Sequence, residues 1–197
     1  MKNLGILIID MQSKFVKTST FGGYDLIKNQ LKLAEFAKEK NIPIFVLEYV
    51  NKGKTVKNLR KHLPQQNVFF IKKYNDNAFI KLKNPKDNSY ICNLEDETIN
   101  HYFPNNPQDY KNYIQESDLN NLLDKNSIKN LILTGIHKDV CVLDTAREAR
   151  SRGYKLITSK EMMDEGEKNC SFSINWYIKN TTYFNSLNEV LNLINSD

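Results

Sequence analysis

Six segments of the chain are apolar at almost every position over the length of a β-strand. Continuous apolar runs of this kind are typical of strands buried on both faces of a parallel sheet, whereas strands with one solvated face alternate. Polar residues separate the runs, so none is long enough to span a membrane. In order along the chain, the predicted strands are 4–9, 42–50, 67–73, 129–136, 154–158 and 181–184.

Helical periodicity fills the intervals between these strands. The clearest case is 25–40, where apolar residues recur at the spacing of one helix face until Asn41 and Pro43 end the pattern. A second helix is predicted at 142–152, with Gly153 in the C′ position. Strands that alternate with helices predict an α/β fold in which helices cover both faces of a parallel sheet. Weaker signals predict a short turn at 59–63, a helix at 118–126 capped by Ser117, and a last helix after a Ser186-x-x-Glu189 capping box.

One segment, 84–113, fits neither pattern. It is polar, rich in tyrosine and without helical periodicity, and it is long for a connection in an α/β fold. Residues 89–103 alternate weakly, which is consistent with a hairpin over the edge of the sheet. We interpret the segment as an irregular insertion in a single domain that spans 1–197. It is either a surface excursion or a lid or subunit contact.

The composition narrows the functional class. The 197 residues are 40% hydrophobic, which suits one domain with a sizeable core. The formal net charge is +5, but the lysines are scattered among acids rather than gathered with aromatic residues, so we do not expect nucleic-acid binding. Asp10 interrupts the apolar start of the chain before that run reaches the length of a signal peptide's apolar core. We expect a cytoplasmic protein without a membrane segment.

Cysteine usage supports this interpretation. The three cysteines, Cys92, Cys141 and Cys170, are odd in number and widely spaced, and the sequence has no C-x-x-C pair. This pattern fits neither a disulfide framework nor a structural zinc site. It is typical of a reducing compartment, and we expect neither a metal nor a cofactor.

Polar side chains with complementary chemistry follow three of the predicted strands. Asp10 follows the first, Lys72 and Lys73 end the third, and Cys141 begins the helix after the fourth. Ligands of open α/β sheets bind beyond the carboxyl ends of the strands, so we expect these residues on one rim. Each alone has an ordinary explanation, as a turn cap, a solvated lysine or a small buried hydrophobe. Together they form a candidate catalytic site.

The chemistry of this set is that of acyl transfer. The reactive form of cysteine is the thiolate, and a helix N-terminus and a lysine ammonium would both stabilise it at Cys141. Asp10 would accept the thiol proton and return it to a leaving amine. Unpaired N–H groups at the turn would hold a tetrahedral oxyanion. The sequence therefore predicts a hydrolase that uses no histidine.

Three segments resemble the signature segments of the isochorismatase-like cysteine hydrolases, a superfamily that includes nicotinamidases and carbamoylsarcosine, ureidoacrylate and biuret amidases. They are ILIIDMQSKF, FFIKKYNDNAF and LTGIHKDVCVLDTAREARSRGY, and they run from the first predicted strand to the fifth. The third is the most specific, because it contains G-x-x-x-x-x-C-V-x-x-T-A from Gly135 to Ala146. The resemblance implies a doubly wound, three-layer α/β/α fold whose six parallel strands lie in the order 3-2-1-4-5-6.

The resemblance also implies roles for individual residues. Asp10, Lys73 and Cys141 match the family's catalytic triad; the spacing to the following phenylalanine fits Lys73, whereas Lys72 would need one more residue. The family's oxyanion hole uses two backbone N–H groups, which here would belong to Cys141 and to His137. The peptide bond that enters His137 is then expected to be cis.

Other implied features concern the substrate and the assembly. Phe15 and Phe79 resemble the wall of the family's substrate pocket, although both are equally consistent with core positions. Metal-binding nicotinamidases carry a D-x-H-x-H element after the second strand, which this chain lacks; His62, in that region, is interpreted as a surface residue. True isochorismatases often lack the cysteine, so Cys141 favours a small amide or ureide as the substrate. The resemblance further implies a homo-oligomer, a dimer or a tetramer.

Other interpretations of the function have less support from the sequence. Cys141 to Arg147 matches the C-x5-R signature of cysteine phosphatases, but the intervening VLDTA has no glycine and places Asp144 where a phosphate would bind. A dinucleotide-binding domain would need G-x-G-x-x-G after the first strand. An isochorismatase-type hydrolase of another small molecule, and a family member that only binds a ligand, both stay open.

Overall fold

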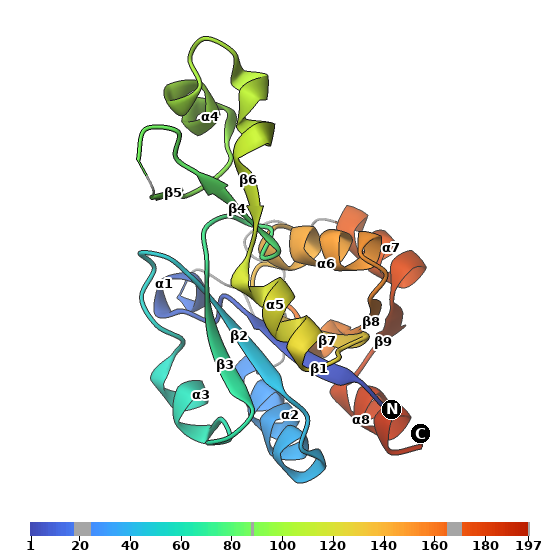
Figure 1. Ribbon diagram of the computed structural model, residues 1–197. Coiled ribbons are helices and arrows are strands. Elements are labelled where there is room, and N and C mark those ends of the chain that lie inside the picture. The colour runs from blue at the N-terminus through green and yellow to red at the C-terminus, as the bar shows by residue number, and fades with distance from the viewer. Residues whose placement is uncertain (18–24, 88, 165–170, 197) are drawn as a thin grey trace.

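The computed structural model describes residues 1–17, 25–87, 89–164 and 171–196. A six-stranded parallel sheet forms its centre, in the order β3-β2-β1-β7-β8-β9 (Figure 1). Counted among these six strands alone, this is the predicted order 3-2-1-4-5-6. The strands are β1 (Leu4–Ile9), β2 (Ile44–Tyr49), β3 (Val68–Lys73), β7 (Asn130–Gly135), β8 (Lys155–Ser159) and β9 (Thr182–Phe184).

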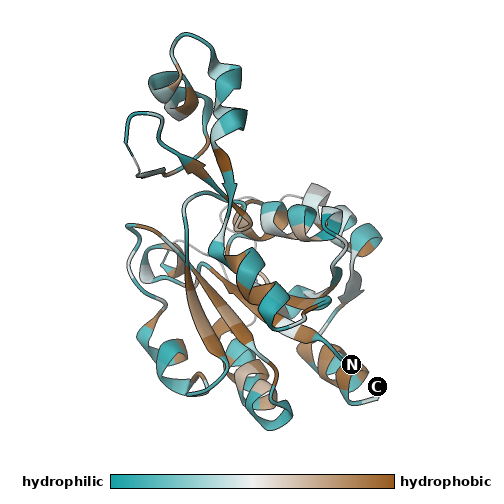
Figure 2. Ribbon diagram, in the orientation of Figure 1, coloured by the Kyte–Doolittle hydropathy of each residue, from teal (hydrophilic) through white to brown (hydrophobic). Residues whose placement is uncertain are grey.

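Helices cover both faces of this sheet, as the continuous apolar strands predicted. The side chains of Ile6 and Ile8 pack in one core with α2 (Leu26–Lys40), α3 (Lys57–His62) and α8 (Leu187–Ser196). Leu7 and Ile9 pack in the other with α5 (Asp118–Lys125), α6 (Cys141–Ser151) and α7 (Ser171–Asn180). Figure 2 shows the apolar strands between helices that are polar on their outer sides. No helix in these described residues is long and apolar enough to cross a lipid bilayer.

Local signals in the sequence are confirmed at several helix ends. The Ser117 hydroxyl accepts a hydrogen bond from the Leu119 N–H at 3.2 Å, which is the predicted cap of α5. The Asp25 carboxylate, which was not predicted as a cap, accepts one from the Lys28 N–H at 3.1 Å at the start of α2. The Ser186 hydroxyl and the Glu189 carboxylate each accept the other's backbone N–H, which is the predicted capping box. Gly153 follows α6 with φ +88°, as a C′ glycine should. Two short helices complete the main body: α1 (Ser13–Val16) and η2 (Lys160–Met162). Neither these two nor α7 was predicted from the sequence.

The long excursion between β3 and α5 has a structure of its own. Figure 1 shows it projecting from one end of the sheet. It contains β4 (Ile80–Lys83), β5 (Tyr90–Ile91), α4 (Asp96–Tyr102), the 3₁₀-helix η1 (Pro107–Tyr113) and β6 (Ile114–Glu116). The three strands form an antiparallel sheet in the order β5-β4-β6.

The expected hairpin over residues 89–103 is wrong. Its first residues form the two-residue strand β5, and the rest continues into α4. Ile99 and Phe103 are four residues apart, and both pack with Leu82 and Ile91 in a small separate core. Asp96 and Glu97 occupy the first helical turn, where acidic side chains are favourable. A four-residue apolar spacing therefore outweighs the weak alternation, and the segment is not irregular.

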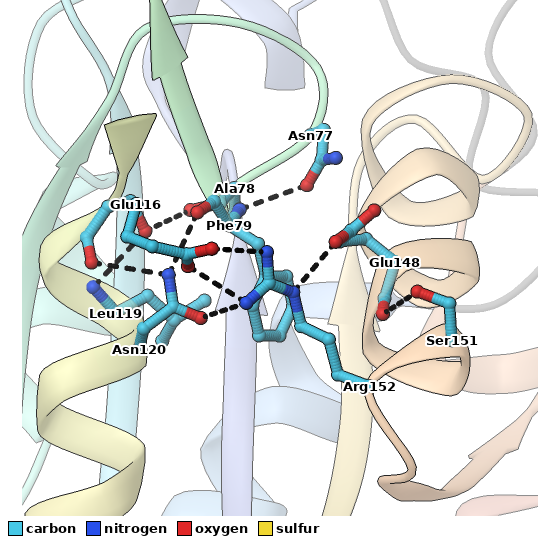
Figure 3. A network of polar contacts seen from close by, with 10 residues as sticks. Asn77, Ala78, Phe79, Glu116, Leu119, Asn120, Glu148, Ser151 and Arg152 are labelled. Carbon is cyan, nitrogen blue, oxygen red and sulfur yellow. Dashed lines mark hydrogen bonds and ion pairs between the residues drawn. The ribbon is translucent and has the colours of Figure 1, made fainter. Parts of the chain in front are cut away.

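A network centred on Arg152 ties the end of the excursion to the main body (Figure 3). The Arg152 guanidinium contacts the Glu116 carboxylate at 2.8 and 2.9 Å, and Arg152 Nε donates to Glu148 at 2.7 Å. It also donates to Asn120 Oδ1 at 3.0 Å and lies 5.2 Å from the centre of the Phe79 ring. The network therefore joins β6, α5 and α6 at the point where the chain returns to the sheet.

Candidate active site

Three of the predicted site residues meet at the carboxyl edge of the central strands. Asp10 follows β1, Lys73 ends β3, and Cys141 is the first residue of α6. Lys73 Nζ lies 2.7 Å from Asp10 Oδ2, and the two side chains are 0% and 1% exposed. Both charges of this pair act on the Cys141 thiol, because Lys73 lowers its pKa and Asp10 raises it. The rim predicted from strand ends therefore brings these three side chains together.

The pleat of β3 decides between the two candidate lysines. Successive side chains on a strand point to opposite faces, so Lys72 and Lys73 cannot both reach the site. Lys72 is exposed, whereas Lys73 is buried beside Asp10. The structure thus places Lys73, and not Lys72, with Asp10 and Cys141.

Close approach of β7 to β1 sets the floor of the site. A Cβ added to Gly135 would lie 2.2 Å from the Ile9 carbonyl oxygen, and its φ is +144°, so only glycine fits there. The next amide, that of Ile136, donates to the same Ile9 oxygen at 3.1 Å. Asp10 itself has φ +53°, a left-handed conformation that aspartate tolerates better than most residues. These features turn the chain sharply at the ends of both strands.

The turn before α6 exposes backbone N–H groups near the thiol. The Ile136–His137 peptide bond is cis. The Val140 and Val142 amides both donate to the His137 carbonyl oxygen at 3.1 Å, one on each side of Cys141. Within the described part of the chain, no acceptor is found for the backbone N–H of His137 or of Cys141. This is the arrangement that an oxyanion hole requires.

A carboxylate that sequence reasoning missed lies against the Cys141 thiol. Cys141 Sγ donates to Asp76 Oδ1 at 3.1 Å. The loop that carries Asp76 is pinned from two sides, because its carbonyl oxygen accepts from Lys73 Nζ and from Thr145 Oγ1, each at 3.2 Å. Thr145 Oγ1 also accepts from the Ala78 amide at 3.2 Å. Asp76 lies three residues after Lys73, and that proximity is the one signal that would have pointed to it.

The two predicted pocket residues lie in different places. The half-buried ring of Phe15 packs edge to face against His137 and Tyr49, with ring centres 6.0 and 6.2 Å apart, so it borders the site. Phe79 does not: it is completely buried in the core against Tyr154.

Tyr49, which the sequence did not single out, belongs to the site. It ends β2 on the same rim, and Lys73 Nζ lies 5.3 Å from the centre of its ring. Burial, together with the negative charge of Asp76, raises the pKa of the Tyr49 hydroxyl. Tyr49 therefore stays neutral and contributes an aromatic face beside the lysine.

Burial dominates the electrostatics of the nucleophile. It raises the pKa of the Cys141 thiol; Lys73 opposes that shift, and the negative charges of Asp10 and Asp76 add to it. The helix N-terminus and the lysine were expected to stabilise the thiolate; Lys73 does lower the pKa, but burial raises it by more. The thiol instead donates a hydrogen bond to Asp76.

Burial and charge act in opposite directions on the pKa values of Asp10 and Lys73. Burial raises the pKa of Asp10, and Lys73 opposes this. Burial by itself would lower the pKa of Lys73, but the negative charges of Asp10, Cys141 and Asp76 outweigh it, so that pKa is raised. Burial also lowers the pKa of His137, which keeps that imidazole neutral.

The structure also bears on the possibility of a metal site. Among the residues that the structure describes, no group of three His, Cys, Asp or Glu side chains is arranged to hold a metal ion. His62 is exposed on α3, and its Nδ1 lies 2.7 Å from the Asn58 carbonyl oxygen.

Solved structures of several proteins share this fold. A cysteine hydrolase from Pseudomonas syringae has a TM-score of 0.69 at 14% sequence identity, with 98% of this chain and 93% of that chain covered. A nicotinamidase from Staphylococcus aureus has a TM-score of 0.62 at 20% identity, covering 92% and 95%. A ribonuclease from Caenorhabditis elegans has a TM-score of 0.65 at 17% identity, covering 96% and 79%. Such identities show a common fold and not a common reaction.

A family model is more specific than these structural similarities. The model of the isochorismatase domain matches residues 5–163. This range includes Asp10 after β1, Lys73 at the end of β3 and Cys141 at the start of α6. The chain belongs to the isochorismatase domain family.

Proposed function

We propose that this protein is a hydrolase that cleaves the C–N bond of a small amide or ureide through a thioester on Cys141. The observation that carries the proposal is the buried Asp10–Lys73 ion pair beside a thiol at the first residue of α6. A nucleophile with a carboxylate in range and free N–H groups nearby is suited to acyl transfer. The similar fold of a nicotinamidase supports the choice of an amide.

The first half of the reaction forms the thioester. Asp10 accepts the Cys141 thiol proton as the sulfur attacks the carbonyl carbon. The N–H groups of His137 and Cys141 hold the oxyanion of the tetrahedral intermediate. When that intermediate collapses, the C–N bond breaks, and Asp10 returns the proton to the departing nitrogen, which leaves as ammonia or an amine.

The second half regenerates the thiol. Asp10 accepts a proton from water as the water oxygen attacks the thioester carbon. The C–S bond breaks, the proton passes from Asp10 to the sulfur, and a carboxylic or carbamic acid leaves. Asp10 thus begins and ends each half-reaction ionised, with Lys73 2.7 Å away. Lys73 favours the carboxylate and, during the attack, the negative charge that develops on sulfur.

A screen for ammonia release tests the proposal. Purified protein would be incubated with primary amides and ureides, including nicotinamide, butyramide, N-carbamoylglycine and biuret. We expect release from at least one compound, and a loss of about 10²-fold or more in Asp10→Asn, because an amide cannot accept and return the proton. Asp25→Asn is the matched control, since asparagine caps α2 as well as aspartate does. Full activity in Asp10→Asn would overturn the assignment of the base.

A further inference from the structure

A small cavity adjoins the loop that carries Asp76, and its wall is acidic. Its volume is about 190 Å³, and its lining consists of Asn75, Asp76, Asn77, Asn93, Leu94, Glu95 and Asp144. Three of these residues are acids and none is a base. Asp76 connects the cavity to the candidate nucleophile, because its Oδ1 accepts the Cys141 thiol hydrogen bond at 3.1 Å. A substrate whose carbonyl carbon lies at Sγ would therefore place its neighbouring atoms against Asp76.

One residue of the cavity wall, Asn75, carries a buried acceptor that has no partner among the described residues. Asn75 is 2% exposed, and its Nδ2 donates to the Ile80 carbonyl oxygen at 3.0 Å. That bond fixes the amide, and Asn75 Oδ1 is left with no hydrogen-bond partner among the described residues. A buried acceptor left unpaired costs free energy, so an N–H donor from a ligand would satisfy it. This is independent of the acids and indicates the same kind of ligand.

Within the described part of the chain, no ion pair neutralises Asp76. The Lys73 ammonium acts on the thiol, but it is already paired with Asp10 at 2.7 Å. Asp144 has a long contact of 3.5 Å with the exposed Arg147, outside the cavity. Repulsion by Asp76 and burial both raise the pKa of Asp144, with burial the larger cause. A cation in the cavity would relieve this repulsion.

We propose that the substrate carries an ammonium or guanidinium group next to its scissile carbonyl, and that Asp76 and Asn75 Oδ1 bind this group. The inference rests on the proposed amide or ureide hydrolysis and adds the substrate's charge to it. Bound there, the cation replaces the thiol as the hydrogen-bond donor to Asp76. The thiol is then free to turn to Asp10, the base that takes its proton. The cation also offsets the negative charge that develops on sulfur.

Matched amides test the charge of the substrate directly. β-Alaninamide and butyramide have the same number of heavy atoms and differ in carrying an ammonium or a methyl group. In the wild-type protein we expect kcat/KM for β-alaninamide to exceed that for butyramide by about tenfold or more. In Asp76→Asn the ratio should fall toward one. Asp96→Asn removes an exposed acid that does not line the cavity, and it should keep the wild-type ratio. Equal kcat/KM values in the wild type, or an unchanged ratio in Asp76→Asn, would overturn the inference.

A second measurement does not depend on hydrolysis, so it separates failure of this inference from failure of the proposed function. Cys141 would be labelled with 2-aminoethyl or 2-sulfonatoethyl methanethiosulfonate, and the modified peptide quantified by mass spectrometry. After correction for each reagent's rate with free N-acetylcysteine amide, the cationic reagent should react about tenfold faster or more.

The same labelling ratio identifies Asp76 as the source of the preference. Asp76→Asn should reduce the ratio severalfold, and Asp96→Asn should not. A ratio between the two reagents cancels any general change in the reactivity of the thiol. Preferential labelling without hydrolysis of any amide would retain the cation site and reject the amidase; hydrolysis of butyramide without preferential labelling would do the reverse.

Discussion

The Lys73 ammonium lies 2.7 Å from the Asp10 carboxylate, and neither side chain is more than 1% exposed. Removing two charges from water is expensive, and their attraction compensates for it only while both are present. The pair joins the ends of β1 and β3 across β2. It therefore links the stability of the sheet edge to the chemistry proposed there.

Substitution of one partner should expose this link. Lys73→Met retains most of the volume but leaves the Asp10 carboxylate buried without its cation. We expect the free energy of unfolding, measured by urea denaturation, to fall by about 3–5 kcal/mol. Lys72→Met is the control on the same strand; its side chain is exposed, so the change should stay within about 0.5 kcal/mol. Equal effects in the two variants would contradict the ion pair.

The loss in Lys73→Met should depend on pH. Burial already raises the pKa of Asp10, and the variant lacks the cation that opposes this rise. A carboxyl whose folded-state pKa is raised stabilises the fold below its unfolded value of about 3.9, and this contribution is lost as the pH rises through the folded-state pKa. The unfolding free energy of Lys73→Met should thus fall more steeply with rising pH than that of the wild type. Parallel curves would show that Asp10 does not titrate differently in the two proteins.

The reactivity of the resting thiol should respond in opposite directions to its two charged neighbours. The pKa of Cys141 is raised, so labelling by iodoacetamide should be slower at neutral pH than that of an ordinary thiol with a pKa of about 8.5. Lys73→Met removes a cation and should slow it further. Asp76→Asn removes a negative charge and should speed it. The measurement is the labelling rate of the Cys141 peptide against pH, and a change of the same sign in both variants would contradict these electrostatics.

Two glycines test the packing beneath the site. Gly135 and Gly153 both have positive φ, but an added Cβ meets the Ile9 carbonyl oxygen at 2.2 Å only at Gly135; around Gly153 nothing lies within 4 Å. Gly135→Ala should destabilise the fold by several kcal/mol or prevent folding, whereas Gly153→Ala should cost about 1 kcal/mol of backbone strain. Thermal unfolding of the two variants measures the difference. A similar small shift in both would mean that β7 does not approach β1 this closely.

The sheet was predictable because its strands are apolar on both faces and its helices carry caps. Ile6 and Leu7 are both fully buried, in opposite cores, so a continuous run was the expected signature. The excursion was not, since its structure depends on contacts that are distant in sequence. Leu82 and Ile91 become apolar partners for Ile99 only after β4 and β5 have paired.

The candidate site was likewise only partly predictable from the sequence. Asp10, Lys73 and Cys141 could be placed because strand ends of a parallel sheet meet at one edge. The role of Asp76 could not, because its position depends on a loop that Thr145 and Lys73 hold by its carbonyl oxygen. The direction of the Cys141 pKa was also mispredicted. Proximity to a helix end and a lysine is visible in a sequence, whereas the depth of burial that outweighs them is not.

The most direct test of the central claim is to look for the thioester itself. Wild-type protein would be quenched with acid during turnover of an amide found in the screen, digested, and mapped by mass spectrometry beside Cys141→Ala. We predict that the Cys141 peptide gains the mass of the substrate's acyl group in place of one hydrogen, that hydroxylamine removes this adduct, and that Cys141→Ala releases no ammonia. Ammonia release by Cys141→Ala at the wild-type rate would contradict it.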